Sequence, residues 1–177
     1  MNRILNECQF LFFLNKTKRF GCQKLKIFEL CKLKRKTMTI EQVQQDIIEE
    51  FSVYTDWMDK YGYLIELGNE LQDLDAKEKT DQNLIKGCQS RVWLVAELEN
   101  GKINFRGESD AVIVKGLVAL LLRVVSGRTP DELIENELHF IDDLGLKQHL
   151  SPTRSNGLLA MVKQIRLYAV AYKKIAG

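Results

Sequence analysis

Apolar residues recur at steps of three and four along residues 40–58, which is the spacing of one face of an α-helix. They are Ile40, Val43, Ile47, Phe51, Tyr54 and Met58. A second short helix is expected to carry Trp57, Tyr61, Leu64 and Ile65, with Gly68 as its C-terminal stop. Residues 69–83 are polar and acidic, so they are expected to form a surface loop.

Residues 92–98 alternate between two faces, which is typical of a β-strand. Val92, Leu94, Ala96 and Leu98 share one face, while Trp93 and Val95 lie on the other. Asn100 and Gly101 follow, and this pair favours a tight hairpin turn because both residues accept a positive φ. Residues 103–109 then supply the return strand, so the pattern predicts an antiparallel hairpin.

Residues 110–125 are apolar nearly all round, which predicts a buried central helix. Ser109 or Asp110 is the expected N-cap, and Gly127 is the expected stop. Lys115 and Arg123 interrupt the apolar run, so it is not expected to span a membrane.

The remaining residues predict three further helices. Thr129 as N-cap, Pro130 at the first position and Glu132 closing a capping box predict a helix start. A short helix ends at Gly145, a turn-rich loop covers residues 149–157, and residues 158–174 form an amphipathic terminal helix. Helices around one antiparallel hairpin or small sheet make the expected fold class α+β.

The charge is divided unevenly along the 177 residues, whose net charge is +2. Residues 1–37 hold ten basic and two acidic side chains, whereas residues 38–177 hold sixteen basic and twenty-two acidic ones. An acidic globular part argues against a nucleic-acid surface. The cysteine pattern lacks both a disulfide framework and a C-x-x-C pair, so the protein is expected to be cytoplasmic and reduced.

The basic segment 1–37 is interpreted as an extension that precedes the true start of the protein. Its longest apolar stretch, QFLFFL, is too short to span a membrane. Met38 directly precedes Thr39 and Gln42, which form a capping-box pattern at the start of the periodic region. We therefore expect Met38 to be the biological start and 38–177 to be the functional domain. The alternative is a genuine basic arm for a membrane or a nucleic acid.

Cys88 is the first candidate for chemistry, because it is the only cysteine of residues 38–177. It precedes the first strand of the hairpin and follows Gly87, whose backbone freedom allows a loop to turn the thiol in or out. A thiolate is a nucleophile, with Lys86 and Arg91 nearby in the sequence. The alternative is a buried cysteine that only fills space.

Two other groups of residues are candidates for a site. His139 and His149 are ten residues apart with no ligand motif joining them to Cys88, so no metal site is predicted. Arg154 lies among small polar residues in LSPTRSNG, just before a predicted helix. It is either a solvated residue of a capping loop or a partner for an anion or thiolate.

Four blocks of sequence, in this order and spacing, resemble the SufE family of sulfur-acceptor proteins. They are KGCQSRVWL, SDAVIVKGLVALLL, SGRTPDEL and LSPTRSNGLLAMVKQI. The resemblance covers about residues 40–175, and segment 1–37 has no counterpart in it. It implies a small curved antiparallel sheet with helices packed on one face, similar to the fold of IscU-type scaffolds.

The resemblance also implies a function. Such proteins accept sulfur from a pyridoxal-phosphate cysteine desulfurase (SufS-like), raise its turnover and pass the sulfur to an iron–sulfur scaffold complex (SufBCD-like). Cys88 matches the cysteine that carries the persulfide, so the protein would act beside an enzyme and not as a stand-alone one. Persulfide transfer needs one activated thiol and no cofactor, whereas a cluster scaffold needs several converging ligands.

The remaining expectations concern the residues around the thiol. Gly87, Gln89 and Ser90 are expected to let the loop swing Cys88 from an inward position into a partner's active site. Asp110, Arg154 and Asn156 are expected to shape the docking surface or the setting of the thiol. Two alternatives stay open: a regulatory adaptor that does not need Cys88, and a cysteine hydrolase, for which no histidine partner is evident.

Overall fold

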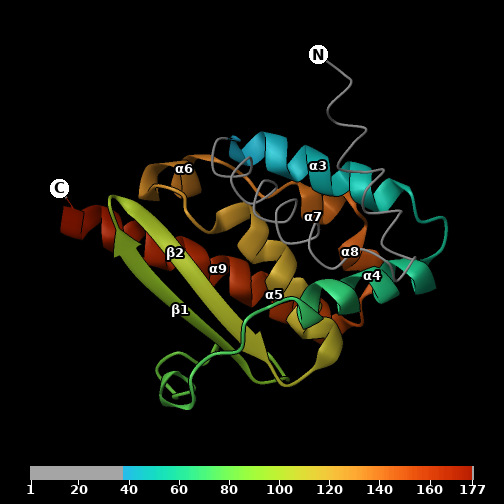
Figure 1. Ribbon diagram of the computed structural model, residues 1–177, viewed down its shortest axis with the longest axis horizontal. Coiled ribbons are helices and arrows are strands. Elements are labelled where there is room, and N and C mark those ends of the chain that lie inside the picture. The colour runs from blue at the N-terminus through green and yellow to red at the C-terminus, as the bar shows by residue number, and fades with distance from the viewer. Residues whose placement is uncertain (1–37, 177) are drawn as a thin grey trace, which may run out of the picture. The chain divides into compact units, whose positions relative to one another are not determined.

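The computed structural model describes residues 38–176, and residues 40–177 form one compact unit (Figure 1). Segment 1–37 and the prediction made for it lie outside the described residues. The unit contains a two-stranded sheet with helices, which confirms the predicted α+β class. Within the described residues, no helix has the length and apolar character needed to cross a membrane.

The first two helices are α3 (Ile40–Ser52) and α4 (Trp57–Asn69). The apolar face of α3 is buried as predicted, but the helix ends at Ser52 and does not continue to Met58. Asp56 starts the next helix instead, because its carboxylate accepts a hydrogen bond from the Asp59 N–H at 2.9 Å. Met58 therefore lies in α4, where it is 78% exposed.

Strands β1 (Val92–Glu99) and β2 (Lys102–Ser109) form the predicted antiparallel hairpin. Asn100 and Gly101 turn with φ values of 51° and 74°, as the sequence predicted. The outer edge of β2 is covered, since the Ile103 N–H donates to the Arg128 carbonyl and the Ser126 hydroxyl accepts from the Phe105 N–H. The loop before β1 contains one short helix, η2 (Ala76–Glu78), at the surface.

Helix α5 (Val112–Val125) is the buried centre of the unit and lies beside the hairpin in Figure 1. It packs against β2 on one side and against α4 on the other. A Cβ added to Gly116 would lie 2.2 Å from the Leu64 carbonyl oxygen, so the two helices cross with their backbones in contact. Gly68 belongs to the same crossing, with Gly116 as its nearest neighbour. The prediction of Gly68 as a helix stop was wrong, because α4 continues past it to Asn69.

The N-cap of α5 is Ala111, with no side-chain capping bond, so the prediction of Ser109 or Asp110 as N-cap was also wrong. Both side chains form hydrogen bonds with the backbone of Arg91, and the Ser109 hydroxyl accepts from the Ala111 N–H as well. The capping box of Thr129 and Glu132 is present at the start of the next helix, as predicted.

The C-terminal part consists of α6 (Pro130–Glu135), α7 (Phe140–Asp143), α8 (Leu146–His149) and α9 (Pro152–Ala176). The terminal helix begins six residues earlier than expected, because Pro152 opens it and the Ser155 N–H already donates to the Ser151 carbonyl. Arg154 and Asn156 therefore lie on the first turns of α9 and not in a loop. Tyr172 of this helix donates to the Ala96 carbonyl of β1 at 2.7 Å, which holds α9 against the outer edge of the hairpin.

Candidate functional site

Cys88 lies on a loop of residues 86–91, at the entrance to β1. The preceding residues run antiparallel to β1, since the Ile85 N–H donates to the Val92 carbonyl at 2.8 Å and the Leu94 N–H donates to the Asn83 carbonyl at 2.9 Å. These two bonds close the base of the loop. Within the loop, Gly87 has a φ of +90°, which side chains of L-residues rarely adopt.

A second set of bonds holds the exit of the loop. The Arg91 N–H donates to the Asp110 carboxylate at 3.0 Å, and the Ser109 hydroxyl donates to the Arg91 carbonyl at 2.9 Å. Asp110 also donates its own N–H to that carbonyl, at 3.3 Å. Both ends of the loop are therefore anchored to the hairpin.

Cys88 is partly exposed, and its thiol packs against the side of α9. A Cβ added to Gly157 would lie 2.7 Å from Sγ, a distance that real Cβ atoms essentially never show. One turn further along α9, Ala160 lies beside Gly87, at 3.9 Å from the position of an added Cβ. The absence of a side chain at Gly157 is therefore what lets the sulfur lie against the helix.

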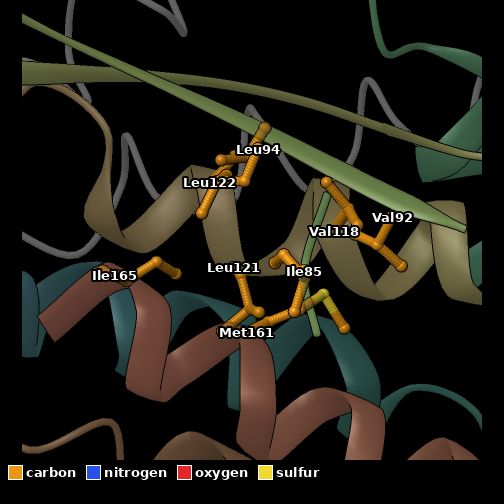
Figure 2. A pocket seen from close by; sticks show the side chains of 8 residues that line it. All are labelled: Ile85, Val92, Leu94, Val118, Leu121, Leu122, Met161 and Ile165. Atoms are coloured by element: carbon orange, nitrogen blue, oxygen red, sulfur yellow. The ribbon is translucent and has the colours of Figure 1, made fainter. Parts of the chain in front are cut away.

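The base of the loop continues into the apolar core, where a cavity of about 10 Å³ remains (Figure 2). Side chains of β1, α5 and α9 surround it together with Ile85. The lining residues are Ile85, Val92, Leu94, Val118, Leu121, Leu122, Met161 and Ile165. The lining has no polar group, so the cavity offers water no hydrogen-bond partner. The core beneath the loop is therefore apolar and tightly packed.

A comparison with models of protein families finds the same family that the sequence blocks resemble. The family model described as "SufE: Fe-S metabolism associated domain" matches residues 45–169, which is most of the chain. The chain belongs to the SufE family. Its fold is also similar to the solution structure of a hypothetical protein from Thermus thermophilus. That pair has 20% sequence identity and a TM-score of 0.62, covering 76% of this chain and 97% of the other.

The other predicted site residues of this SufE-family protein fall into three groups. Asp110 holds the exit of the Cys88 loop through its bond to the Arg91 N–H. Arg154 and Asn156 are exposed on α9, with Arg154 one turn before Gly157, and neither side chain forms a hydrogen bond or ion pair within the described residues. Gln89 is exposed and Ser90 half-buried within the loop itself.

Gly157 is the residue of this site that the sequence analysis missed. The sequence pattern predicts a loop at residues 149–157, where a glycine needs no special explanation. Its signal was a glycine within an otherwise helical pattern, which costs about 1 kcal/mol relative to alanine and therefore points to a packing or functional reason. Here the reason is the close approach of the Cys88 sulfur.

Both histidines are engaged in contacts of their own. His139 Nδ1 lies 2.6 Å from an Asp143 carboxylate oxygen, and Nε2 lies 2.9 Å from a Glu41 carboxylate oxygen. These hydrogen bonds, that of Asp143 first, raise the pKa of His139 above its ordinary value. His149 stacks on Trp57 with ring centroids 3.9 Å apart. Among residues 38–176, no group of three or more His, Cys, Asp or Glu side chains is arranged to hold a metal ion.

Proposed function

We propose that this SufE-family protein is a sulfur acceptor and carrier. It takes sulfur from a pyridoxal-phosphate cysteine desulfurase of the SufS type, raises the turnover of that enzyme and passes the sulfur to a SufBCD-like iron–sulfur scaffold. The observation that carries the proposal is the placement of Cys88. It is the only cysteine of residues 38–177, it lies within the matched family domain, and it is partly exposed on an anchored loop.

The proposed reaction is an exchange at a sulfur–sulfur bond. The Cys88 thiolate attacks the terminal sulfur of the desulfurase persulfide, so that a new S–S bond forms on Cys88 while the S–S bond of the enzyme breaks. The enzyme cysteine leaves as a thiolate, and Cys88 becomes the persulfide. No net oxidation or reduction takes place, so the step requires no further reagent. Removing the persulfide frees the desulfurase for its next turnover.

The Cys88 loop is proposed to move between two positions. The contact of Sγ with Gly157 supports an inward position in which α9 shields the sulfur, and the anchored loop ends support motion of residues 86–90 alone. Gly87, Gln89 and Ser90 would supply the change in backbone angles. Hydrogen exchange of these amides should change when the desulfurase is added. Unchanged exchange in the presence of bound desulfurase would contradict the proposed swing.

Asp110, Arg154 and Asn156 take different parts in this proposal. Asp110 would keep the loop in register with β1 through its bond to the Arg91 N–H. Arg154 and Asn156 would belong to the docking surface, because both are exposed on the helix against which the thiol rests.

The test is alanine production by the cognate desulfurase from free cysteine, with and without this protein. Wild-type protein should stimulate the enzyme, and Cys88→Ser should not. Peptide mapping by mass spectrometry should locate one added sulfur atom on Cys88. This mapping step distinguishes Cys88 from Cys8, Cys22 and Cys31, which the full chain also contains.

The alternative function is a regulatory adaptor that binds a desulfurase or another iron–sulfur enzyme without carrying sulfur. Stimulation that survives Cys88→Ser would establish the adaptor and refute the carrier. A carrier needs the thiol of Cys88 for each transfer, whereas an adaptor acts through its surface alone.

A further inference from the structure

A groove of about 570 Å³ begins beside the Cys88 loop and runs along α9. Residues 81–86 form one wall, and side chains of α9 form the other. The α9 residues are Ala160, Lys163, Gln164, Leu167 and Tyr168. Among the lining residues, Lys86 begins the Cys88 loop and Ala160 lies beside Gly87 of that loop. A chain segment in this groove would therefore have one end at Cys88.

The wall formed by residues 81–86 offers the unused backbone N–H and C=O of one residue, Leu84. Leu84 lies between two residues that are hydrogen-bonded to β1, through the Ile85 N–H and the Asn83 carbonyl. In an antiparallel pair, the N–H and C=O of such an intervening residue point away from the paired strand. Within residues 38–176, neither group of Leu84 has a hydrogen-bond partner. An extended peptide pairs with an edge of this kind through its own backbone.

The side chains of the groove add an apolar contact surface. Leu167 is 53% exposed although it is a large aliphatic residue. It shares the groove with Leu84, Ala160 and Tyr168, so apolar atoms are present on both walls. Such a surface suits side chains that alternate along an extended segment, with every second one facing the groove.

The charge of the groove indicates the character of its occupant. Lys86 and Lys163 both line it, and neither forms an ion pair with another described residue. This distinguishes them from lysines elsewhere in the unit that are paired with carboxylates. Such pairs are Lys79–Glu108, Lys115–Asp73, Lys147–Asp142 and Lys173–Asp131. Asp81 is the one acidic lining residue, and it lies at the other end of segment 81–86 from Lys86. The end of the groove near Cys88 is therefore cationic.

We propose that this groove receives an extended, acidic segment of the desulfurase, namely the segment that carries its persulfide cysteine. The inference rests on the proposed function and adds to it where the donor chain lies. Backbone pairing with Leu84 aligns the segment, Leu167 holds its apolar side chains, and Lys86 and Lys163 attract carboxylates close to its cysteine. The donor persulfide is thereby delivered to Cys88, where the exchange at its S–S bond takes place as described above.

The experiment measures the concentration of this protein that gives half-maximal stimulation of the desulfurase. Lys163→Glu should raise it about fivefold at low salt, and high salt should remove most of that effect because exposed charges are screened. Leu167→Ala should raise it about tenfold at either salt concentration, as expected for an apolar anchor. Stimulation at saturating protein should stay at the wild-type level, because Cys88 is untouched.

Two matched controls lie on the same helix outside the groove. Lys174→Glu reverses a lysine that is also exposed and without an ion pair among the described residues, and Leu159→Ala truncates a leucine that is 46% exposed. Both controls should behave like the wild type. If the two groove variants match their controls while the wild type stimulates, the groove inference is wrong and the proposed function stands. If the wild type itself does not stimulate, the proposed function fails instead.

A second measurement identifies the occupant. Loading of Cys88 by inorganic polysulfide needs no docking, so the groove variants should be loaded as fast as the wild type. Slower loading would mean that the groove acts on the thiol itself or binds small anions, which overturns the assignment. Normal stimulation combined with impaired transfer to the scaffold would show that the groove serves the recipient and not the donor, which also overturns it.

Discussion

Replacing Gly157 by alanine tests whether the Cys88 thiol rests against α9. The new Cβ would lie 2.7 Å from Sγ, whereas ordinary van der Waals contact begins near 3.4 Å, so the sulfur must move by at least about 0.7 Å. The Cys88 Cβ and Cα lie 3.6 and 3.9 Å from the same point and need not move. Rotation of the Cys88 side chain to another staggered position would relieve the overlap.

The expected change in stability follows from two opposing effects. Alanine in place of glycine stabilises a helix interior by about 1 kcal/mol. Displacing the sulfur from its site removes a similar amount, about 1 kcal/mol, because its packing contact with α9 is lost. Gly157→Ala should therefore leave the free energy of unfolding nearly unchanged in the wild type. In a Cys88→Ala background, where no sulfur is displaced, the same substitution should stabilise by about 1 kcal/mol.

The assay is urea unfolding of the four proteins in this double-mutant cycle, together with the rate of Cys88 alkylation by iodoacetamide. The coupling free energy should be about 1 kcal/mol, and alkylation of Gly157→Ala should be several-fold faster than that of the wild type. Additive effects within about 0.3 kcal/mol, with an unchanged alkylation rate, would refute the inward position of the thiol.

Two further predictions concern the rest of the unit. The raised pKa of His139 implies stability that is fully present below its unfolded pKa of about 6.5 and is lost as the pH rises through the folded value. His139→Gln should reduce this pH-dependent loss of stability, by less than about 1 kcal/mol in the free energy of unfolding because the ring is partly exposed. A pH profile of the urea midpoint identical to that of the wild type would contradict this contribution of His139. Gly116→Ala should destabilise by roughly 3 kcal/mol or more, since its Cβ would meet the Leu64 carbonyl oxygen at 2.2 Å. Gly62→Ala in α4 is the control and should stabilise by about 1 kcal/mol, because nothing lies within 4 Å of its added Cβ; similar urea midpoints for the two variants would be the contrary result.

Local sequence patterns were sufficient wherever neighbouring residues decide the structure. The alternation of residues 92–98 and the Asn100–Gly101 turn predicted the hairpin, and the capping box of Thr129 and Glu132 predicted the start of α6. These features depend on side-chain period, on φ preference and on bonds over three residues, all of which are properties of a short segment. The apolar run of α5 likewise predicted the central buried helix.

The errors occurred where contacts between distant residues decide the outcome. The sequence pattern predicts a helix stop at Gly68, but this residue allows α4 to cross α5 at Gly116, which is 48 positions away in the chain. Asp110 is one of the two helix caps that the sequence predicts, but its carboxylate accepts a hydrogen bond from the Arg91 N–H. A glycine or an aspartate has the same local preference in either setting, so its sequence neighbours could not distinguish them.

The sequence by itself determined the α+β class, the loop position of Cys88 and the resemblance to the SufE family, because these follow from short periodic segments and from blocks of residues in a fixed order. Only the tertiary structure decided that α9 begins at Pro152, that Gly157 receives the Cys88 sulfur, and that segment 81–86 and α9 enclose a groove beside the loop. The physical reason is that the loop and α9 are about seventy residues apart in the chain. The contact between them depends on how the hairpin and α5 pack, and this packing cannot be predicted from a local sequence pattern.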